Sequence, residues 1–204
     1  MTLWLTWRYW GDDMLFNMIL PGAVSEEPFA FEYSGNYTDN RVDGIGDVTL
    51  NTSGTLTVTG QTVTVSVYIL GGGGGGADAS SWGRRAGGGG GGYQTVEVTL
   101  EPGTYEIIIG SGGTPVSQSG TNTVTAGNGG DTIAFGFTST GGKGATVSYG
   151  SQAAGNGGAP GGTSGTMIQN SVDGVASGGS PNGGGASRGA PQPGGNGLVR
   201  ITFS

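Results

Sequence analysis

The sequence predicts an all-β fold: a small β-sandwich or sheet scaffold that carries a polyglycine II helix bundle with variable loops and almost no α-helix. Alternating apolar and polar residues, typical of half-buried strands, occur within residues 29–70, 93–110 and 198–204. Two tracts of six glycines, residues 71–76 and 87–92, interrupt this alternation. The chain has 49 glycines among 204 residues but only 10% charged residues, which is unlike charge-rich disorder.

The two glycine tracts could be flexible coil or ordered rods. Glycine loses more conformational freedom on folding than any other residue, and flexible linkers are rich in it. In the polyproline II conformation, with three residues per turn, six residues span roughly 18 Å, and chains without side chains can lie close enough to pair their backbones. Because the tracts match in length, the sequence favours rods in one excursion out of a sheet and back, with its tip at residues 78–85.

The first 24 residues predict an apolar docking segment. Trp4, Trp7 and Trp10 recur every three residues, and a second apolar run follows a Gly-Asp-Asp interruption. The segment lacks the basic start of a secretory signal, and it is too short and too polar to span a bilayer. Two interpretations stay open: core packing within this chain, or docking onto a larger assembly or sister subunits.

The predicted β scaffold covers residues 25–70. Phe29, Phe31 and Tyr33 alternate with small or polar residues, as in a half-buried strand. Residues 48–70 alternate on both sides of a Gly-Gln pair at 60–61, which predicts a hairpin turn.

The third predicted region, residues 71–204, is glycine-rich with interleaved and closing strands. Strand-like alternation resumes at residues 93–100, and Glu101-Pro102-Gly103 predicts a type II turn with its glycine at positive φ. The chain leaves the sheet near Gly110 and re-enters it at Leu198. Because a structureless loop of that length is improbable inside a compact domain, the intervening glycine clusters favour a bundle over disorder.

Composition argues against catalysis and nucleic-acid binding. The chain has no cysteine and no histidine, so the commonest nucleophilic thiol and general base are missing. Its net charge of −7 would repel a phosphate backbone. The carboxylates at Glu26, Glu27, Glu97, Glu101 and Glu106 lie in a linker or beside predicted strands, without the spacing or aromatic subsites of a glycosidase. We expect neither an enzyme nor a cofactor.

One loop, DNRVDGIGD, concentrates oxygen donors. Asp39, Asn40, Asp43 and Asp47 surround two glycines and could hold calcium. The spacing does not match an EF-hand, and Asp, Asn and Gly are ordinary turn residues. We therefore expect turns here, with calcium binding as the less favoured alternative.

The candidate recognition residues lie between the glycine clusters. Trp82, Arg84 and Arg85 occupy the first predicted tip. Aromatic rings stack on sugars, and arginine offers a planar donor fork for carboxylate or phosphate groups. Tyr149, Met167 and Gln169 are weaker candidates. The structural alternative is that Trp82 packs on a neighbouring glycine rod and the two arginines are solvated.

Several segments occur in an order that resembles a known family. They are VYILGGGGGG, then GGGGGGYQTVEVTLEPGTYEIIIGSGG, GNGGDTIAFG and STGGKGA, and finally GGNGLVRITF. Over roughly residues 50–204 this order is similar to the glycine-rich domain of bacteriophage tail proteins. More loosely, the chain resembles the distal adhesins of T-even-like phages, in which polyglycine II helices form a lattice topped by variable loops, and the glycine-rich region of anaplastic lymphoma kinase. The first 20 residues match no attachment domain.

The resemblance implies attachment to a host surface. We expect a phage tail fibre or tip adhesin, located on the virion outside the cell, that binds a bacterial glycan or outer-membrane protein through displayed loops. The N-terminal segment would contact other virion proteins, with a homotrimer as one arrangement, and we expect no nucleic acid and no membrane insertion. The alternative is a structural virion protein, such as a head fibre or decoration spacer.

Overall fold

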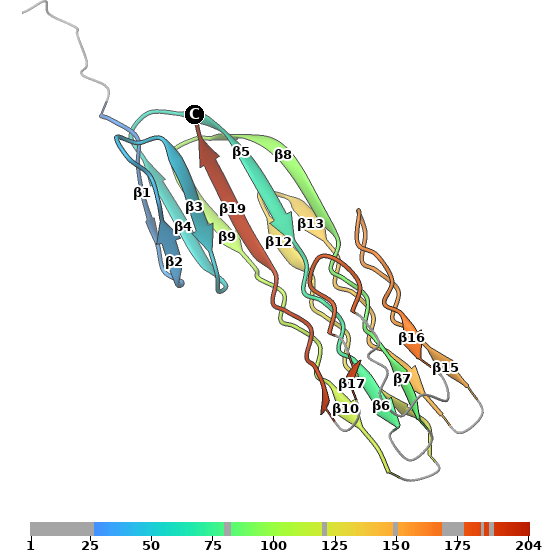
Figure 1. The fold of residues 1–204 in the computed structure, drawn as a ribbon. Helices are drawn as coiled ribbons and strands as arrows, with labels where there is room; N and C mark the ends of the chain where they lie inside the picture. The colour runs from blue at the N-terminus through green and yellow to red at the C-terminus, as the bar shows by residue number, and fades with distance from the viewer. Residues whose placement is uncertain are drawn as a thin grey trace, which may run out of the picture.

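The computed structural model describes residues 27–79, 83–119, 122–148, 151–168, 178–184, 186–187 and 190–204. These residues form strands, turns and extended segments, with no helix among them, which confirms the all-β fold class. A β-sandwich head lies at one end, and a shaft of extended segments leads away from it to a tip that carries short strands (Figure 1).

The head consists of two antiparallel sheets. The larger has the order β2-β3-β19-β5-β8, with bounds Tyr37–Asp39, Gly46–Leu50, Leu198–Phe203, Val63–Leu70 and Tyr93–Leu100. The smaller has the order β1-β4-β9, with bounds Ala30–Tyr33, Gly54–Thr59 and Gly103–Ile107. The two sheets enclose the hydrophobic core, which Leu50, Leu56, Ile69, Leu100 and Ile201 fill with other aliphatic side chains.

The two turns at 60–61 and 101–103 join different sheets. Strand β4 belongs to the smaller sheet and β5 to the larger, so the predicted hairpin at Gly60-Gln61 is wrong. Alternation fixes which face of a strand is buried but not which strand lies beside it. Gly103 does not have a positive φ, contrary to the predicted type II turn, because it already begins β9 and pairs with Val58.

The predicted excursion from the sheet is confirmed. Strands β5 and β8 flank the two glycine tracts and pair from Val63↔Leu100 to Leu70↔Tyr93. The last strand, β19, returns between β3 and β5. The larger sheet therefore holds both ends of the first excursion and the closing end of the second.

Hydrogen bonds show the shape of the shaft. The N–H groups along the first tract donate in turn to the C=O groups of Gly92, Gly130, Gly195, Gly89, Gly127 and Gln192, at 2.8–3.0 Å. Donors three residues apart thus reach the same neighbouring segment, as expected for rods with three residues per turn. The carbonyls repeat likewise: Gly72 and Gly75 accept from Gly142 and Ala145. The tract therefore lies inside a bundle of extended rods.

The bundle requires glycine because a neighbouring backbone occupies the space of a side chain. A Cβ at Gly73 would lie less than 3.0 Å from the carbonyl oxygen of Asn182, and a Cβ at Gly90 equally close to that of Ser180. Real Cβ atoms do not show such separations. Each rod thus packs through its backbone alone, and the predicted rods replace the alternative of flexible coil.

Short strands lie at both ends of the shaft. Near the head, β12 (Thr132–Ala134) and β13 (Phe137–Ser139) form a hairpin. At the far end lie β6 (Ala77–Ala79), β7 (Arg84–Ala86), β10 (Val116–Ser117), β11 (Val124–Thr125), β14 (Thr146–Val147), β15 (Gln152–Ala153), β16 (Met167–Ile168), β17 (Ala186–Ser187) and β18 (Ala190–Pro191).

Candidate functional site

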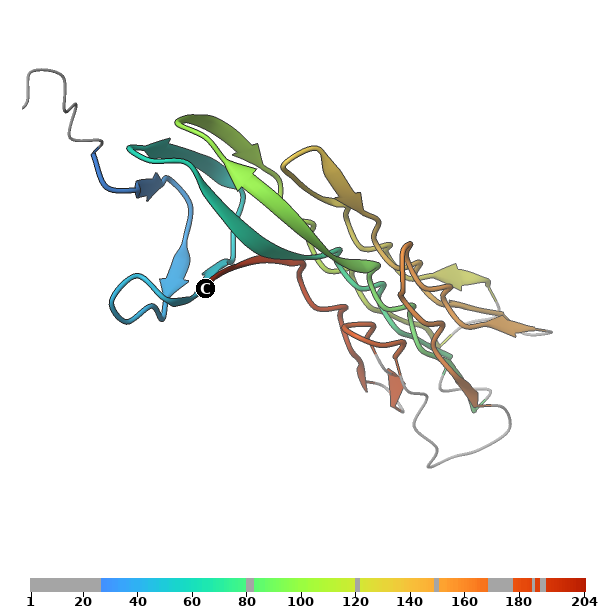
Figure 2. The same cartoon turned by 90° about the horizontal axis from the view of Figure 1, so that it is seen from above.

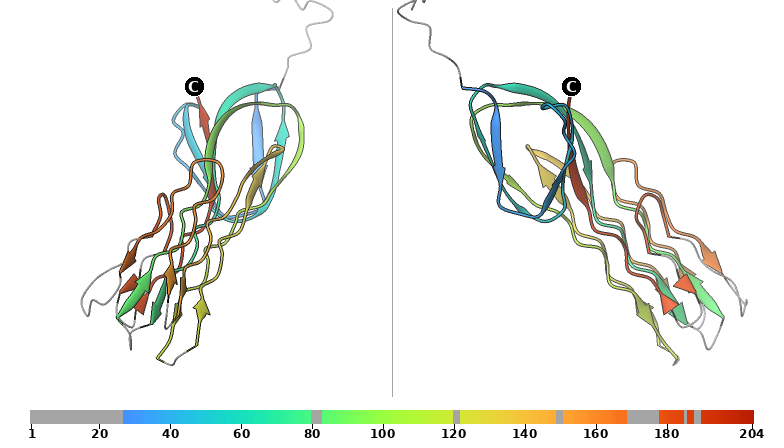
Figure 3. Two further views of the ribbon diagram at one scale, coloured as in Figure 1. Left: turned by 90° about the vertical axis from the view of Figure 1, so that its right-hand side faces the viewer. Right: turned by 60° about the vertical axis from the view of Figure 1, so that its left-hand side comes forward.

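The tip of the shaft collects chain reversals from distant parts of the sequence. Its strands form a sheet with the order β10-β6-β7-β16, a second sheet β11-β14-β15, and the β17–β18 hairpin. Figure 3 shows from two sides that these strands gather at the end away from the head. Beneath them lies a small apolar cluster that includes Ala77, Ala86, Ala145 and Val147. The tip is therefore a composite surface on a small core.

A buried ion pair lies inside this tip. Asp78 on β6 and Arg85 on β7 are directly opposite each other, and both are 0% exposed. The Arg85 Nε lies 3.2 Å from the Asp78 Oδ1, and the Ser117 hydroxyl on β10 donates to the Asp78 Oδ2 at 3.4 Å. The pair joins three strands of the tip sheet beneath its surface.

Other polar groups of the tip contact one another. Arg84 is partly buried, and its Nη1 donates to the Ser148 carbonyl at 3.4 Å. The Thr125 and Thr146 hydroxyls lie 2.9 Å apart, across β11 and β14. Gln152 has a buried side-chain oxygen without a hydrogen-bond partner among the described residues. The described tip thus offers accessible hydroxyl and guanidinium groups at Thr125 and Arg84, whereas the Gln152 oxygen is buried.

The structure separates the predicted recognition residues. Met167 is 53% exposed at the tip, and Arg84 is partly accessible. Arg85 differs from the prediction: it is fully buried with Asp78 and is neither solvated nor available as a surface contact. Trp82, Tyr149, Gln169, Trp4, Trp7 and Trp10 lie outside the described residues.

Sequence reasoning missed the role of Asp78, although the sequence carries a signal for it. The register that pairs Gly71 with Gly92 also places Asp78 opposite Arg85, because both pairs are equidistant from the centre of the excursion. Because the two glycine tracts are equal in length, an antiparallel register places residue 78 opposite residue 85. These residues are an aspartate and an arginine, so the sequence could have predicted the charged pair.

The other charged cluster lies at the far end of the head. Arg41 forms an ion pair with Asp39 at 2.7 Å, and its guanidinium lies 4.7 Å and 4.8 Å from the ring centroids of Phe31 and Phe203. The hydrogen bond from Arg41 lowers the pKa of the Asp39 carboxyl, and burial opposes this shift. This cluster closes the edge of the sandwich where β1, β2 and β19 meet.

The predicted calcium alternative finds little support at this loop. Asp39 binds Arg41, and Asp47 accepts a hydrogen bond from the Thr202 hydroxyl at 2.7 Å. Asp43 has φ 52° and Gly44 φ 83° within a reverse turn, consistent with ordinary turn residues. Within the described ranges, no group of three or more Asp, Glu, His or Cys side chains is placed to hold a metal ion.

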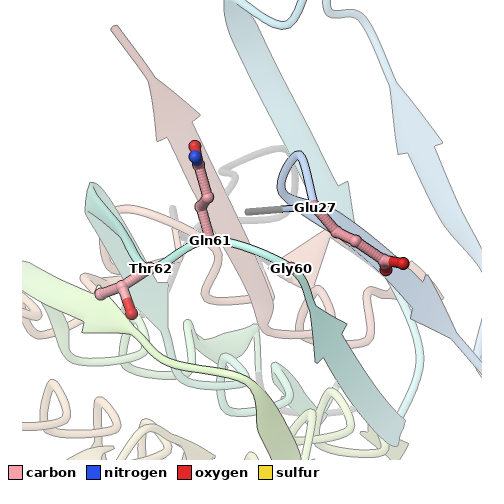
Figure 4. Close-up of a pocket in the computed structure, with 4 residues that line it drawn as sticks. All are labelled: Glu27, Gly60, Gln61 and Thr62. Carbon is pink, nitrogen blue, oxygen red and sulfur yellow. The ribbon is translucent and has the colours of Figure 1, made fainter. Parts of the chain in front are cut away.

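A shallow hollow beside the start of β1 does not form a convergent site. Glu27, Gly60, Gln61 and Thr62 line it. Figure 4 shows that the side chains of Glu27, Gln61 and Thr62 point in different directions. The hollow offers no set of groups aimed at one ligand.

The part of the chain that the structure describes contains no apolar helix of the length that a membrane span requires.

The sequence matches a known family. The model of a family described as a glycine-rich domain matches residues 49–203, which include most of the head and the whole shaft. No curated protein matches the chain.

Proposed function

The chain belongs to this glycine-rich domain family, and on that premise we propose that it is a phage tail fibre or tip adhesin that binds a bacterial surface with the tip of its shaft. The proposal rests on one observation: the short tip strands lie at the opposite end of the shaft from the head. Nine short strands, from β6 to β18, lie at the tip, whereas the first and last described strands, β1 and β19, lie in the head at the other end (Figures 1 and 2). A rigid scaffold that gathers loops at one end is a common design for binding.

The charge distribution supports a tip-first approach. Residues 27–70, 93–110 and 198–204 carry eight acidic and two basic residues, whereas residues 71–92 and 111–197 carry three acidic and four basic ones. Bacterial surfaces rich in phosphate or carboxylate would therefore repel the head more strongly than the shaft and tip. Repulsion of this kind acts over roughly a Debye length, about 8–10 Å at physiological salt.

The chemistry of the tip fits a surface glycan with acidic groups. A partly accessible guanidinium at Arg84 can donate to carboxylate or phosphate oxygens. Met167 adds an exposed apolar contact, and the sequence places Trp82 two residues before Arg84. We assign recognition to Trp82, Arg84 and Met167, and we keep Tyr149 and Gln169 as weaker candidates.

The experiment measures binding of fluorescently labelled protein to a panel of bacterial strains, including mutants that lack surface polysaccharide. For a strain that binds, Trp82→Ala with Arg84→Ala should reduce binding at least about tenfold, which corresponds to about 1.4 kcal/mol. Glu106→Ala, an exposed change in the head, serves as the matched control and should leave binding unchanged. Equal binding by the tip variant and the control would contradict the proposal.

The second candidate is a structural spacer of the virion. The burial of Arg85 favours it, because Arg84 is then the one accessible cation on the described tip strands, with the exposed Lys143 three residues before β14. In that case particles carrying the Trp82→Ala, Arg84→Ala variant would assemble and adsorb normally, whereas deletion of residues 111–191 would impair assembly.

A further inference from the structure

Every asparagine in the glycine rods of the shaft is followed directly by a glycine. The pairs are Asn128-Gly129, Asn156-Gly157, Asn182-Gly183 and Asn196-Gly197. Asparagine before glycine is the dipeptide most prone to deamidation, because a glycine without a side chain lets its backbone nitrogen reach the asparagine carboxamide. The two reacting groups must also be free to approach each other. The hydrogen bonds of the folded shaft therefore determine which of the four pairs can react.

Three of the four pairs are held at both reacting groups. The side-chain oxygens of Asn128, Asn182 and Asn196 accept backbone N–H groups at 2.8–2.9 Å, from Gly144, Gly91 and Gly112 in that order. The N–H groups of the glycines that follow donate to the carbonyls of Gly142, Gly179 and Gly110 at 2.7–2.8 Å. Reaction at any of these pairs requires both bonds to break first.

The fourth pair, Asn156-Gly157, is held at neither reacting group. Asn156 is exposed, its side chain makes no hydrogen bond to the described part of the chain, and the Gly157 N–H finds no acceptor there. The rod itself is still fixed, because the N–H groups of Gly155 and Gly158 donate to the second glycine tract at 2.9 Å and 2.8 Å. With three residues per turn, the Gly157 N–H belongs to a different row of donors. Only the backbone carbonyl of Asn156 is bonded, to the Lys143 N–H at 2.8 Å.

We propose that Asn156 is a modification site, the one of the four asparagines that deamidates in the folded protein. The Gly157 backbone nitrogen loses its proton and attacks the Asn156 Cγ, so a bond from nitrogen to Cγ forms. The bond from Cγ to Nδ2 breaks, and ammonia leaves with the proton. Water then opens the cyclic imide at either carbonyl and leaves aspartate or isoaspartate. The reaction is hydrolytic and uses no oxidant, metal or further reagent.

Both products change the shaft at this position. Aspartate adds a negative charge to a chain that already carries a net charge of −7. Isoaspartate diverts the main chain through Cβ and lengthens it by one carbon atom. The Asn156 carbonyl lies against Gly89, where an added Cβ would come within 3.0 Å of its oxygen. A lengthened main chain therefore cannot keep the three-residue repeat of this rod in the packed bundle.

The test follows deamidation of the folded protein during incubation in mildly alkaline buffer. Mass spectrometry of its peptides measures conversion at each asparagine, and free ammonia is measured in parallel. Asn156 should react at least about tenfold faster than Asn128, Asn182 or Asn196, because each of these must first open locally. A rate at Asn156 no higher than at the other three would overturn the proposal.

Two controls separate the effect of the fold from that of the sequence. In urea that unfolds the protein, the four pairs should react at similar rates, and an undiminished lead of Asn156 would overturn the proposal. Asn156→Gln keeps the carboxamide but disfavours ring closure, and it should fold because the Asn156 side chain makes no bond to the described residues. Ammonia release from this folded variant should fall to the level set by the remaining amides, and an unchanged release would also overturn the proposal.

Discussion

Strands β5 and β8 continue from the head directly into the two glycine tracts. The same two segments of the chain are therefore stabilised by different interactions in the head and in the shaft. In the head, Val65, Val67 and Ile69 are buried against the smaller sheet. In the shaft, the two glycine tracts bury only backbone. Their N–H groups donate to backbone carbonyls of neighbouring segments, except that of Gly91, which donates to the Asn182 side-chain oxygen. The head is therefore stabilised by packed side chains, whereas the glycine shaft can form only where side chains are absent.

This contrast predicts opposite responses to substitution. Removing methyl groups from a packed core destabilises it by the lost burial and the cavity left behind. Adding a methyl group to the shaft instead places it on a neighbouring carbonyl, where no rotamer change can relieve the overlap. The head should thus tolerate exchanges among aliphatic residues, and the buried shaft glycines should tolerate none.

The largest effect should come from Gly73→Ala combined with Gly90→Ala. Each new Cβ would overlap a backbone carbonyl on another rod, and we expect each to cost about 3 kcal/mol or more. The shaft should lose its polyproline-like circular dichroism and its amide protection while the head signals remain. Gly103→Ala is the control, because its nearest atom would be 3.9 Å away; equal stability of both proteins would show that the shaft is not close-packed.

The next largest effect should come from the buried ion pair of the tip, and it tests whether the tip, like the head, is stabilised by its side chains. Asp78→Ala leaves Arg85 buried beside the alanine cluster, and loss of one partner of a buried pair costs about 3–5 kcal/mol. Replacing both residues with leucine should cost much less, because no charge stays buried. Urea unfolding of the single and double variants measures the difference. A double variant as unstable as Asp78→Ala would contradict this account.

A core deletion in the head gives the reference for these values. Leu50→Ala removes a fully buried side chain between the sheets, at a cost of about 2–5 kcal/mol. Leu50→Ile should cost less than about 1.5 kcal/mol, since the volume is kept. We expect amide exchange to accelerate in β3, β5 and β19 and less in the second tract. An equal acceleration in shaft and head would show that the two unfold as one unit.

The same contrast explains how much of the fold could be predicted. Period-two alternation identified the head strands, and matched glycine tracts identified the excursion, since both are local patterns. Strand pairing was not local: β4 and β5 follow each other in sequence but belong to different sheets. Nothing in the alternation at residues 54–70 specifies that separation.

The candidate site was predicted less completely. The position of the tip near residues 78–85 follows from the symmetry of the excursion, but arginine is rarely fully buried, so Arg85 was placed at the surface. The contacts of the Asn182 side chain with Gly71 and Gly91 could not be predicted either, because these partners are about a hundred residues away in the sequence. Their closeness results only from the way the rods pack.

The smallest effect concerns pH and should be confined to the head. The hydrogen bond from Arg41 lowers the folded-state pKa of Asp39, so the ion pair stabilises the fold above the unfolded pKa, and this stability is lost as the pH falls through the lowered value. Because the pair is partly exposed, we expect it to contribute only about 0.5 kcal/mol to the free energy of unfolding.

Arg41→Met should raise the Asp39 pKa toward its ordinary value in a carboxyl-carbon NMR titration and should weaken the pH dependence of unfolding. Asp43→Asn, in the adjacent exposed turn, should leave the Asp39 pKa in place; a fall in this variant as large as the rise in Arg41→Met would mean that general loop charge, not the Arg41 hydrogen bond, sets the pKa. The glycine amides of residues 71–76 and 87–92 should show no change in exchange that follows this titration, because none of the groups that accept their hydrogen bonds ionises.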